Sequence, residues 1–281
     1  MERGARVRAA RRRRPKRPRF VCLVEGPQCL QTGVVTPDDP VPSPSLLNEP
    51  PDRESPMPSW PVLEEFFDAG HLPPEWMDAL WSQGWRHFGS RFFRYSMTVH
   101  QGRPVRVTPL RIDLGRWTPS RSQSRILRKA HDLEVTVERP TVDDEHQHLF
   151  ALHTQRFRTN VPERLETFLG PDPGRRRHAQ GYPCDCVEIC VRHGGRLVAA
   201  SYLDLGREAA SSVYGFFDPS EHRRSLGIAT LLWEIRHARE RGCRHLYPGY
   251  AYDEPSAYDY KKRLGALERF NWRTWEAWDP V

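Results

Sequence analysis

The second half of the chain contains one succession of elements that restricts the fold more than any other feature. Two apolar, strand-like segments, VEICVRH and RLVAASYLDL, are joined by Gly194-Gly195, a pair that favours a two-residue β-turn. A third strand-like segment, SSVYGFFD, follows them. Apolar residues at helical spacing then predict a helix in SLGIATLLWEIRHARERG, which stops at Gly242, and an apolar strand, HLYPGY, comes next.

A further helix is predicted in EHQHLFALHTQRF, ahead of these strands. Helix, antiparallel strands, and then strand, loop, helix and strand is the order of the GNAT acyltransferase fold. We therefore predict the α+β class, with a mixed, largely antiparallel sheet flanked by helices. In such a fold the substrate lies where two central strands splay apart. The loop RSLGIA, from Arg224 to Ala229, fits the small-residue pattern that GNAT proteins place at a helix N-terminus to meet a phosphate.

The first part of the chain has a different composition. Residues 1–20 hold nine Arg and one Lys against a single acid, which exceeds the net charge of +7 of the whole chain. The rest is therefore close to neutral. Proline recurs through residues 21–56 with little apolar periodicity. We predict a disordered basic and Pro-rich tail over residues 1–56, an N-terminal family segment over 57–135 and a GNAT-like domain over 136–281.

Cys184, Cys186 and Cys190 recur at even spacing, with His193 close behind. Even spacing places the three thiols on one face of an extended segment, where cysteine packs as a small apolar residue. We therefore expect them to bind no metal, and a metal site drawn from them is the alternative. No stretch approaches the ~18 apolar residues of a membrane span, so we expect a cytoplasmic protein without a membrane partner.

The C-terminal strand and the segment after it, HLYPGYAYDEPSAYDYKKRLGALE, bring five tyrosines close to three basic residues. Aromatic rings stack on bases and cations meet phosphates, so this composition suits a surface for the end of a nucleic acid. A half-buried strand with tyrosines at its edge is the alternative.

Five segments together resemble the arginyl-tRNA-protein transferases, and most of all the bacterial branch that places leucine on N-terminal Asp or Glu. They are residues 117–123 (WTPSRSQ), 211–219 (SSVYGFFDP), 225–227 (SLG), 246–250 (LYPGY) and 260–268 (YKKRLGALE). The resemblance implies transfer of Leu or Arg from charged tRNA to a protein N-terminus, which marks that protein for N-degron proteolysis. It implies no cofactor beyond the aminoacyl-tRNA. The cysteine-containing segment that family members carry ahead of SRSQ has no cysteine here.

The resemblance also implies a set of site residues. Those expected to bind the charged 3′ end are Phe216, Phe217, Ser225, Gly227, Tyr247, Gly249, Tyr250 and Tyr260, and those expected to contact the acceptor or a phosphate are Arg121 and Gln123. Direct attack of an α-amine on the aminoacyl ester needs a proton acceptor, for which we expect Asp218. Lys261 is expected to offset the charge that develops on oxygen, and to be at least partly solvated.

Two other functions fit the same residues. An acetyl-CoA-dependent N-acetyltransferase would use the loop from Arg224 to Ala229 for pyrophosphate, and a thermal shift with acetyl-CoA would reveal it. A catalytically silent relative that binds RNA or protein would retain RNA at low salt without any transfer activity. The sequence contains no Ser/His/Asp or Cys/His arrangement whose local context predicts a catalytic nucleophile.

Overall fold

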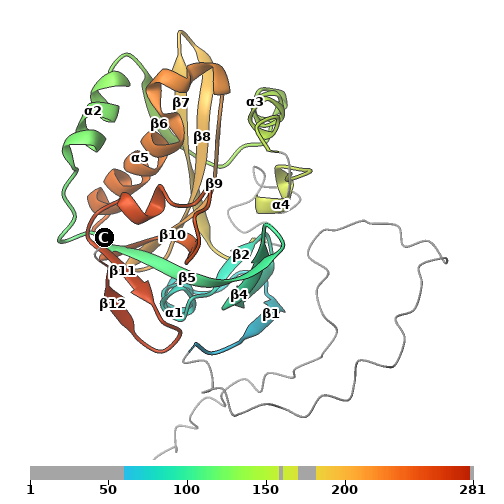
Figure 1. Cartoon of the computed structure of the whole chain (residues 1–281). Helices are drawn as coiled ribbons and strands as arrows, with labels where there is room; N and C mark the ends of the chain where they lie inside the picture. The colour runs from blue at the N-terminus through green and yellow to red at the C-terminus, as the bar shows by residue number, and fades with distance from the viewer. Residues whose placement is uncertain (1–59, 158–160, 170–181, 279–281) are drawn as a thin grey trace, which may run out of the picture. The chain divides into compact units, whose positions relative to one another are not determined.

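A computed structural model describes residues 60–157, 161–169 and 182–278. These residues all belong to one compact unit (Figure 1). The tail expected over residues 1–56 lies outside the part of the chain that is described. Among the helices that are described, none is both long and apolar enough to cross a bilayer.

A small antiparallel sheet begins the described chain. Strands β1 (Glu64–Asp68), β2 (Arg86–Phe88) and β3 (Arg91–Tyr95) lie in the order β1-β3-β2, and helix α1 (Pro74–Ser82) connects β1 to β2. Pro74 suits the first turn of α1 because its missing N–H would have no partner there. Met77 and Trp81 of α1 are buried against residues of β3 and of the large sheet. This packing fixes β2, which carries two of the polar residues considered below.

The large sheet has nine strands in the order β12-β11-β5-β10-β9-β8-β7-β6, with β4 paired to β5. Every pairing in it is antiparallel except that of β9 with β10. The α+β class with a mixed, largely antiparallel sheet is therefore confirmed. The strands are β4 (Met97–His100), β5 (Arg103–Asp113), β6 (Glu134–Glu138), β7 (Asp185–His193), β8 (Arg196–Leu205), β9 (Ala209–Phe217), β10 (His245–Tyr252), β11 (Leu267–Phe270) and β12 (Trp275–Ala277).

Helices cover both faces of this sheet (Figure 1). Alternate residues of β8 show the division, since Ala200 and Tyr202 pack with α3 whereas Ala199 and Leu203 pack on the side of α5. Helix α2 lies beside α5. The helical segments are α2 (Arg121–Lys129), α3 (Asp144–Thr154), α4 (Glu166–Leu169), η2 (Pro219–Arg224), α5 (Leu226–Glu240) and η3 (Lys261–Arg263).

The two central strands β9 and β10 separate soon after they meet. They pair in parallel only from His245 to Tyr247, opposite Ala209 to Ser211. Beyond that point β10 stays with β5, and its register shifts between Leu246 and Gly249. This splay, together with the order of strands and helices, is the GNAT-like arrangement that the sequence predicts.

The expected division at residues 135/136 does not separate two packed units. Strand β5, from the N-terminal segment, lies inside the large sheet between β10 and β11. The boundary falls inside strand β6, which pairs with β7. Because these pairings supply backbone hydrogen bonds to both segments, we expect neither segment to keep its sheet alone.

Candidate active site

Arg86 of β2 reaches the point where β9 and β10 separate. Its Nη1 donates to Ser211 Oγ of β9 and to Tyr247 O of β10, the latter at 3.2 Å, and its Nη2 donates to Ser212 O. Burial lowers the pKa of Arg86, but a guanidinium keeps its proton in proteins. Arg86 therefore places a fixed positive charge between the two strands.

Glu234 of α5 lies close to this charge. Its side chain is 1% exposed, and its Oε2 has no hydrogen-bond partner among the residues that the structure describes. Burial raises the pKa of Glu234 to about 7, although the hydroxyls of Ser212 and Ser201 and the charges of Arg86 and Lys261 act in the opposite direction. A carboxyl with such a pKa can both accept and donate a proton at neutral pH.

Lys261 of η3 completes the cluster. The residue is partly exposed at the surface, but its ammonium lies inside, with Nζ 3.4 Å from Tyr250 O. Burial and the nearby Arg86 lower the pKa of Lys261 to about 7, while Glu234 raises it. The residue is therefore partly exposed, as expected, but its ammonium is largely buried. The bulge in β10 makes the room for it, because a Cβ on Gly249 would come within 3.0 Å of Nζ.

We call Arg86, Glu234 and Lys261 the splay cluster. A carboxyl and an ammonium with pKa values near neutrality are uncommon outside functional sites, since both arise from burial next to a specific charge. Two cations beside one carboxyl can stabilise an oxygen that gains negative charge while the carboxyl moves a proton. The arrangement therefore suits attack of an amine on an acyl group.

Only part of the predicted site comes together around this cluster. Gly249 and Lys261, which the resemblance assigns to the same site, lie close together. Phe217 packs on Gly227, where a Cβ would come within 2.7 Å of the ring, and Arg156 lies 4.5 Å from the centre of the same ring. Phe216 is fully buried in the core beneath α3, and Ser225 holds a left-handed conformation before α5 with no side-chain capping bond.

The rings of Tyr247 and Tyr250 do not face the splay. Tyr250 Oη donates to Gly84 O at 2.7 Å, and its ring is 9% exposed. Tyr247 is 5% exposed and packs between Trp81 and Trp275. Neither ring can stack on a base, so their expected role in binding the tRNA end is corrected: they contribute main-chain oxygens, one to Arg86 and one to Lys261.

Two other tyrosines of the same segment remain accessible. Tyr258 is 42% exposed and Tyr260 is 38% exposed, and both lie close to Lys261 in the sequence. The ammonium of Lys261 lies 4.9 Å from the centre of the Tyr258 ring. These rings, rather than those of β10, are available to stack on a nucleotide.

Asp218 is used elsewhere. Its carboxylate begins η2, where it accepts from Ser220 N at 2.8 Å, and it forms an ion pair with Arg196. Burial alone would raise the pKa of Asp218. The hydrogen bonds from Arg196 and Ser220 outweigh this effect and hold the pKa below its usual range. A carboxylate that is paired and less basic than usual is a poor proton acceptor, so the structure favours Glu234 over Asp218 for that role.

The SRSQ segment supports the turn that carries Lys261. Ser120 begins α2 and forms a capping box with Gln123. The buried Gln123 side chain also donates to Arg263 O at 3.1 Å and to Leu264 O at 3.2 Å, at the end of η3. Both amide hydrogens are therefore used within the protein, which argues against the expected contact with an acceptor or a phosphate. Arg121 is exposed at the start of α2.

We expect Gln123→Ala to lower the free energy of unfolding by about 1–3 kcal/mol, because it leaves buried backbone groups without partners. Urea denaturation measures this change. Arg121→Ala is the matched control, since it alters an exposed residue of the same helix and should stay within about 0.5 kcal/mol of the parent. Equal stability of the two variants would show that Gln123 does not hold the η3 turn.

Sequence reasoning missed Arg86 and Glu234. The signal for Glu234 was present, because an acid interrupts the apolar stripe of α5 between Leu232 and Ile235, where burial is expected. No comparable signal marked Arg86. Its role depends on packing of the small sheet against β9 and β10, which are more than a hundred residues away in sequence.

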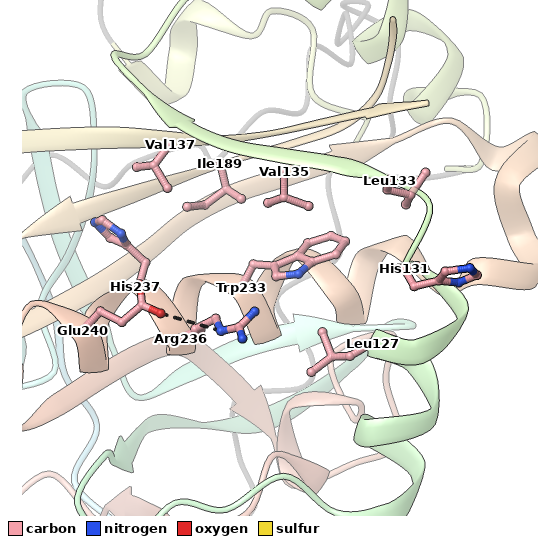
Figure 2. Close-up of a pocket in the computed structure, with 11 residues that line it drawn as sticks. Leu127, His131, Leu133, Val135, Val137, Ile189, Trp233, Arg236, His237 and Glu240 are labelled. Atoms are coloured by element: carbon pink, nitrogen blue, oxygen red, sulfur yellow. Dashed lines mark ion pairs between the residues drawn. The ribbon is translucent and has the colours of Figure 1, made fainter. Parts of the chain in front are cut away.

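A separate groove lies on the other side of α5, between α2, α5 and β6. Figure 2 shows Trp233 at its floor and the pair formed by Arg236 and Glu240 at its rim. Its volume is about 470 Å³, and no member of the splay cluster lines it. The groove is therefore distinct from the candidate active site.

A GNAT-like sheet whose central strands splay around a carboxyl and two cations defines an enzyme of the acyl-transfer class. The sequence comparisons specify it further. Residues 143–271 match the model of the arginine-tRNA-protein transferase C-terminal domain. The chain is 31% identical over 202 residues to an aspartate/glutamate leucyltransferase of Saccharophagus degradans, covering 70% of this chain and 80% of the relative. It is 27% identical over 234 residues to an aspartate/glutamate leucyltransferase of Marinobacter nauticus, covering 80% of this chain and 93% of that relative.

The chain therefore belongs to the arginine-tRNA-protein transferase family and is an aminoacyltransferase. Solved structures resemble it more weakly. A GCN5-related N-acetyltransferase from Kribbella flavida aligns with a TM-score of 0.34 and 18% identity, covering 65% of this chain and 56% of that one. The C-terminal domain of a lysylphosphatidylglycerol synthetase from Agrobacterium fabrum aligns with a TM-score of 0.39 and 16% identity, covering 53% and 48%.

Proposed function

We propose that the splay cluster transfers leucine or arginine from charged tRNA to the α-amine of a protein that begins with an acidic residue. The observation that carries this proposal is the buried Glu234 carboxyl, which has a pKa near 7 and lies beside Arg86 and Lys261. The printed names of the relatives, aspartate/glutamate leucyltransferases, support leucine as donor and acidic acceptors. Charged tRNA is found in the cytoplasm, so we place the enzyme there, where the product is marked for N-degron proteolysis.

The reaction is an aminolysis of the aminoacyl ester. The α-amine nitrogen attacks the ester carbonyl carbon, a C–N bond forms, and the bond from that carbon to the ribose oxygen of the tRNA breaks. Glu234 takes the proton that the amine loses and returns it to the departing ribose oxygen. No covalent intermediate on the enzyme and no cofactor beyond the aminoacyl-tRNA is needed.

Lys261 stabilises the carbonyl oxygen as it gains charge, because its ammonium is already desolvated and needs no reorganisation. Arg86 holds β9 and β10 at their point of separation and adds positive charge there. The partly exposed rings of Phe217, Tyr258 and Tyr260 offer stacking surfaces for the tRNA end. Arg121 remains available for a phosphate at the start of α2.

The acetyltransferase alternative is less well supported by the loop before α5. Arg224 is the first residue of the loop expected to meet pyrophosphate, and its guanidinium is bound to Asp132 and Glu221, with Nη2–Oδ2 and Nε–Oε2 distances of 2.9 and 2.8 Å. Occupation by two carboxylates leaves this guanidinium little capacity to bind a phosphate.

The direct test incubates the full chain with a pool of charged tRNA and peptides that begin with Asp, Glu, Cys, Arg or Lys. Mass spectrometry should detect one added Leu or Arg on the acidic peptides. Acetyl-CoA with the same peptides is the control and should give no product. Acetylation, or retention of RNA at low salt without any transfer, would replace the proposal by the corresponding alternative.

A further inference from the structure

A second buried polar group lies next to the splay cluster, one residue further along β2. It consists of His87, Cys184 just before β7, and Asp204 of β8, which are 3%, 5% and 1% exposed. One imidazole nitrogen, the thiol sulfur and one carboxylate oxygen all lie within 4.8 Å of one another. The three residues come from separate segments, so only the fold brings their donor atoms together.

The tautomer of His87 is set by its surroundings. Its Nδ1 lies 3.0 Å from Gly89 O, and a carbonyl oxygen only accepts, so Nδ1 carries the proton. In a neutral ring Nε2 then presents a lone pair, and Asp204 Oδ2 lies 2.7 Å from it. Two lone pairs at this distance repel each other unless Nε2 takes a second proton or a metal ion binds both atoms.

The contact between His87 and Asp204 does not have the geometry of a hydrogen bond. Nε2 of His87 has no hydrogen-bond partner among the described residues, although Asp204 Oδ2 is close enough to be one. The carboxylate oxygen is therefore not aligned as the acceptor of an N–H on that nitrogen. Two donor atoms that lie close together without this alignment can serve as ligands of one metal ion.

A second triad in the same fold provides a comparison. His146, Glu188 and Cys190 are also buried and also close together. There, however, His146 Nε2 forms a hydrogen bond of 2.6 Å with Glu188 Oε1, and Nδ1 forms one with Asp143. Glu188 Oε2 accepts from Thr141 N at 2.8 Å. The nitrogen and oxygen atoms of this triad have partners within the protein and need no ion.

We infer that His87, Cys184 and Asp204 bind one zinc ion. Imidazole nitrogen, thiolate sulfur and carboxylate oxygen are the donors that zinc takes in proteins. The thiolate and the carboxylate together neutralise a divalent charge, which a buried site requires. A tetrahedral ion needs one more donor, which a water molecule can supply without changing this balance of charge.

The groups around the three donors are those that orient ligands of a metal. The carbonyl of Gly89 holds the His87 ring through its other nitrogen, and Tyr182 Oη donates to the second oxygen of Asp204. The expectation that Cys184 serves only as a core residue rested on its strand spacing. That spacing placed its thiol inside but contained no information about His87, which lies almost a hundred residues earlier.

The ion would join β2 to β7 and β8. Since β2 also carries Arg86, the ion is expected to stabilise the small sheet on which the position of that guanidinium depends. This role is structural, and it can be measured without the transfer reaction.

The test uses the full chain, purified without a histidine tag, and elemental analysis. The parent should contain about one zinc per chain, and Cys184→Ser, His87→Ala and Asp204→Asn should contain little. Cys190→Ser is the matched control, because it changes an equally buried thiol of the comparison triad, and it should keep the ion. A strong chelator should lower the melting temperature of the parent and of Cys190→Ser but not that of Cys184→Ser.

Cobalt substitution covers the case in which a variant fails to fold. The cobalt form of the parent should show a thiolate-to-metal absorption band that is absent from Cys184→Ser and present in Cys190→Ser. A parent that contains no zinc after purification and does not change its melting temperature when zinc is added would overturn the inference. The assignment would also be overturned if Cys184→Ser contained as much metal as the parent. It would be overturned as well if Cys190→Ser lost as much metal as Cys184→Ser.

Discussion

Lys261→Ala is expected to lower the rate of aminoacyl transfer by about 10²–10³-fold, the usual effect of removing one well-placed electrostatic donor. Its ammonium lies inside the splay beside Glu234, where the ester oxygen gains charge in the proposed reaction. The melting temperature should change little, because burial already disfavours the charged form of this side chain. Single-turnover transfer with charged tRNA and thermal unfolding measure the two quantities.

Lys262→Ala is the control for that variant. Lys262 is adjacent in η3, but its Nζ pairs with Asp259 at 2.8 Å instead of entering the splay. Loss of such a pair near the surface costs about 0–1 kcal/mol of stability and should leave transfer close to the parent rate. If both variants transferred as fast as the parent, Lys261 would have no part in the reaction.

Glu234→Gln is expected to lower transfer by about 10²–10⁴-fold, the range for loss of a positioned proton acceptor. The amide keeps the size of the side chain but cannot take a proton from the attacking amine. Glu240→Gln, which alters an exposed acid of the same helix paired with Arg236, should transfer at the parent rate. Unchanged transfer in Glu234→Gln would exclude this carboxyl as the base.

The pH dependence of the transfer rate is a second test of the role of Glu234. In the parent, transfer should fall as pH drops below about 7, where the carboxyl is protonated, and Glu234→Gln should lack this limb. Above about 7 the loss of the Lys261 proton should reduce the parent rate as well. The two apparent values belong to the coupled pair, so a bell-shaped profile centred near neutrality is the expected result.

The raised pKa of Glu234 also makes the free energy of unfolding depend on pH. The folded protein binds the Glu234 proton more tightly than the unfolded chain does, since the pKa rises from 4.5 to about 7. The parent should therefore lose stability relative to Glu234→Gln as pH increases through this interval, and the difference should be constant above it. Urea denaturation at several pH values measures this difference.

Much of the fold could be predicted from the sequence. The strands around Gly194-Gly195 form the expected hairpin, because both glycines take the positive φ values that a two-residue turn needs. The helix that ends before Gly242 and the strand that follows also occur as predicted. Alternation and helical spacing are local properties, so a chain of this composition displays them without any knowledge of its partners.

The candidate site was predicted less well. Lys261 and Gly249 were found because they belong to short motifs, whereas the rings of Tyr247 and Tyr250 were assigned to the tRNA although they are buried. A motif identifies which residues matter but does not say whether the side chain or the main chain acts. At Tyr247 and Tyr250 the carbonyl oxygens face the site, and the rings support it from behind.

The sequence by itself determined the class of fold, the family and the motif that contains Lys261, because these depend on local spacing and on motifs. The tertiary structure alone decided which charges meet. Arg86, Glu234 and Lys261 come from a strand of the small sheet, a helix and a turn near the C-terminus, and burial beside one another shifts their pKa values. Desolvation and Coulomb interaction act through space, so no local pattern in the chain encodes them.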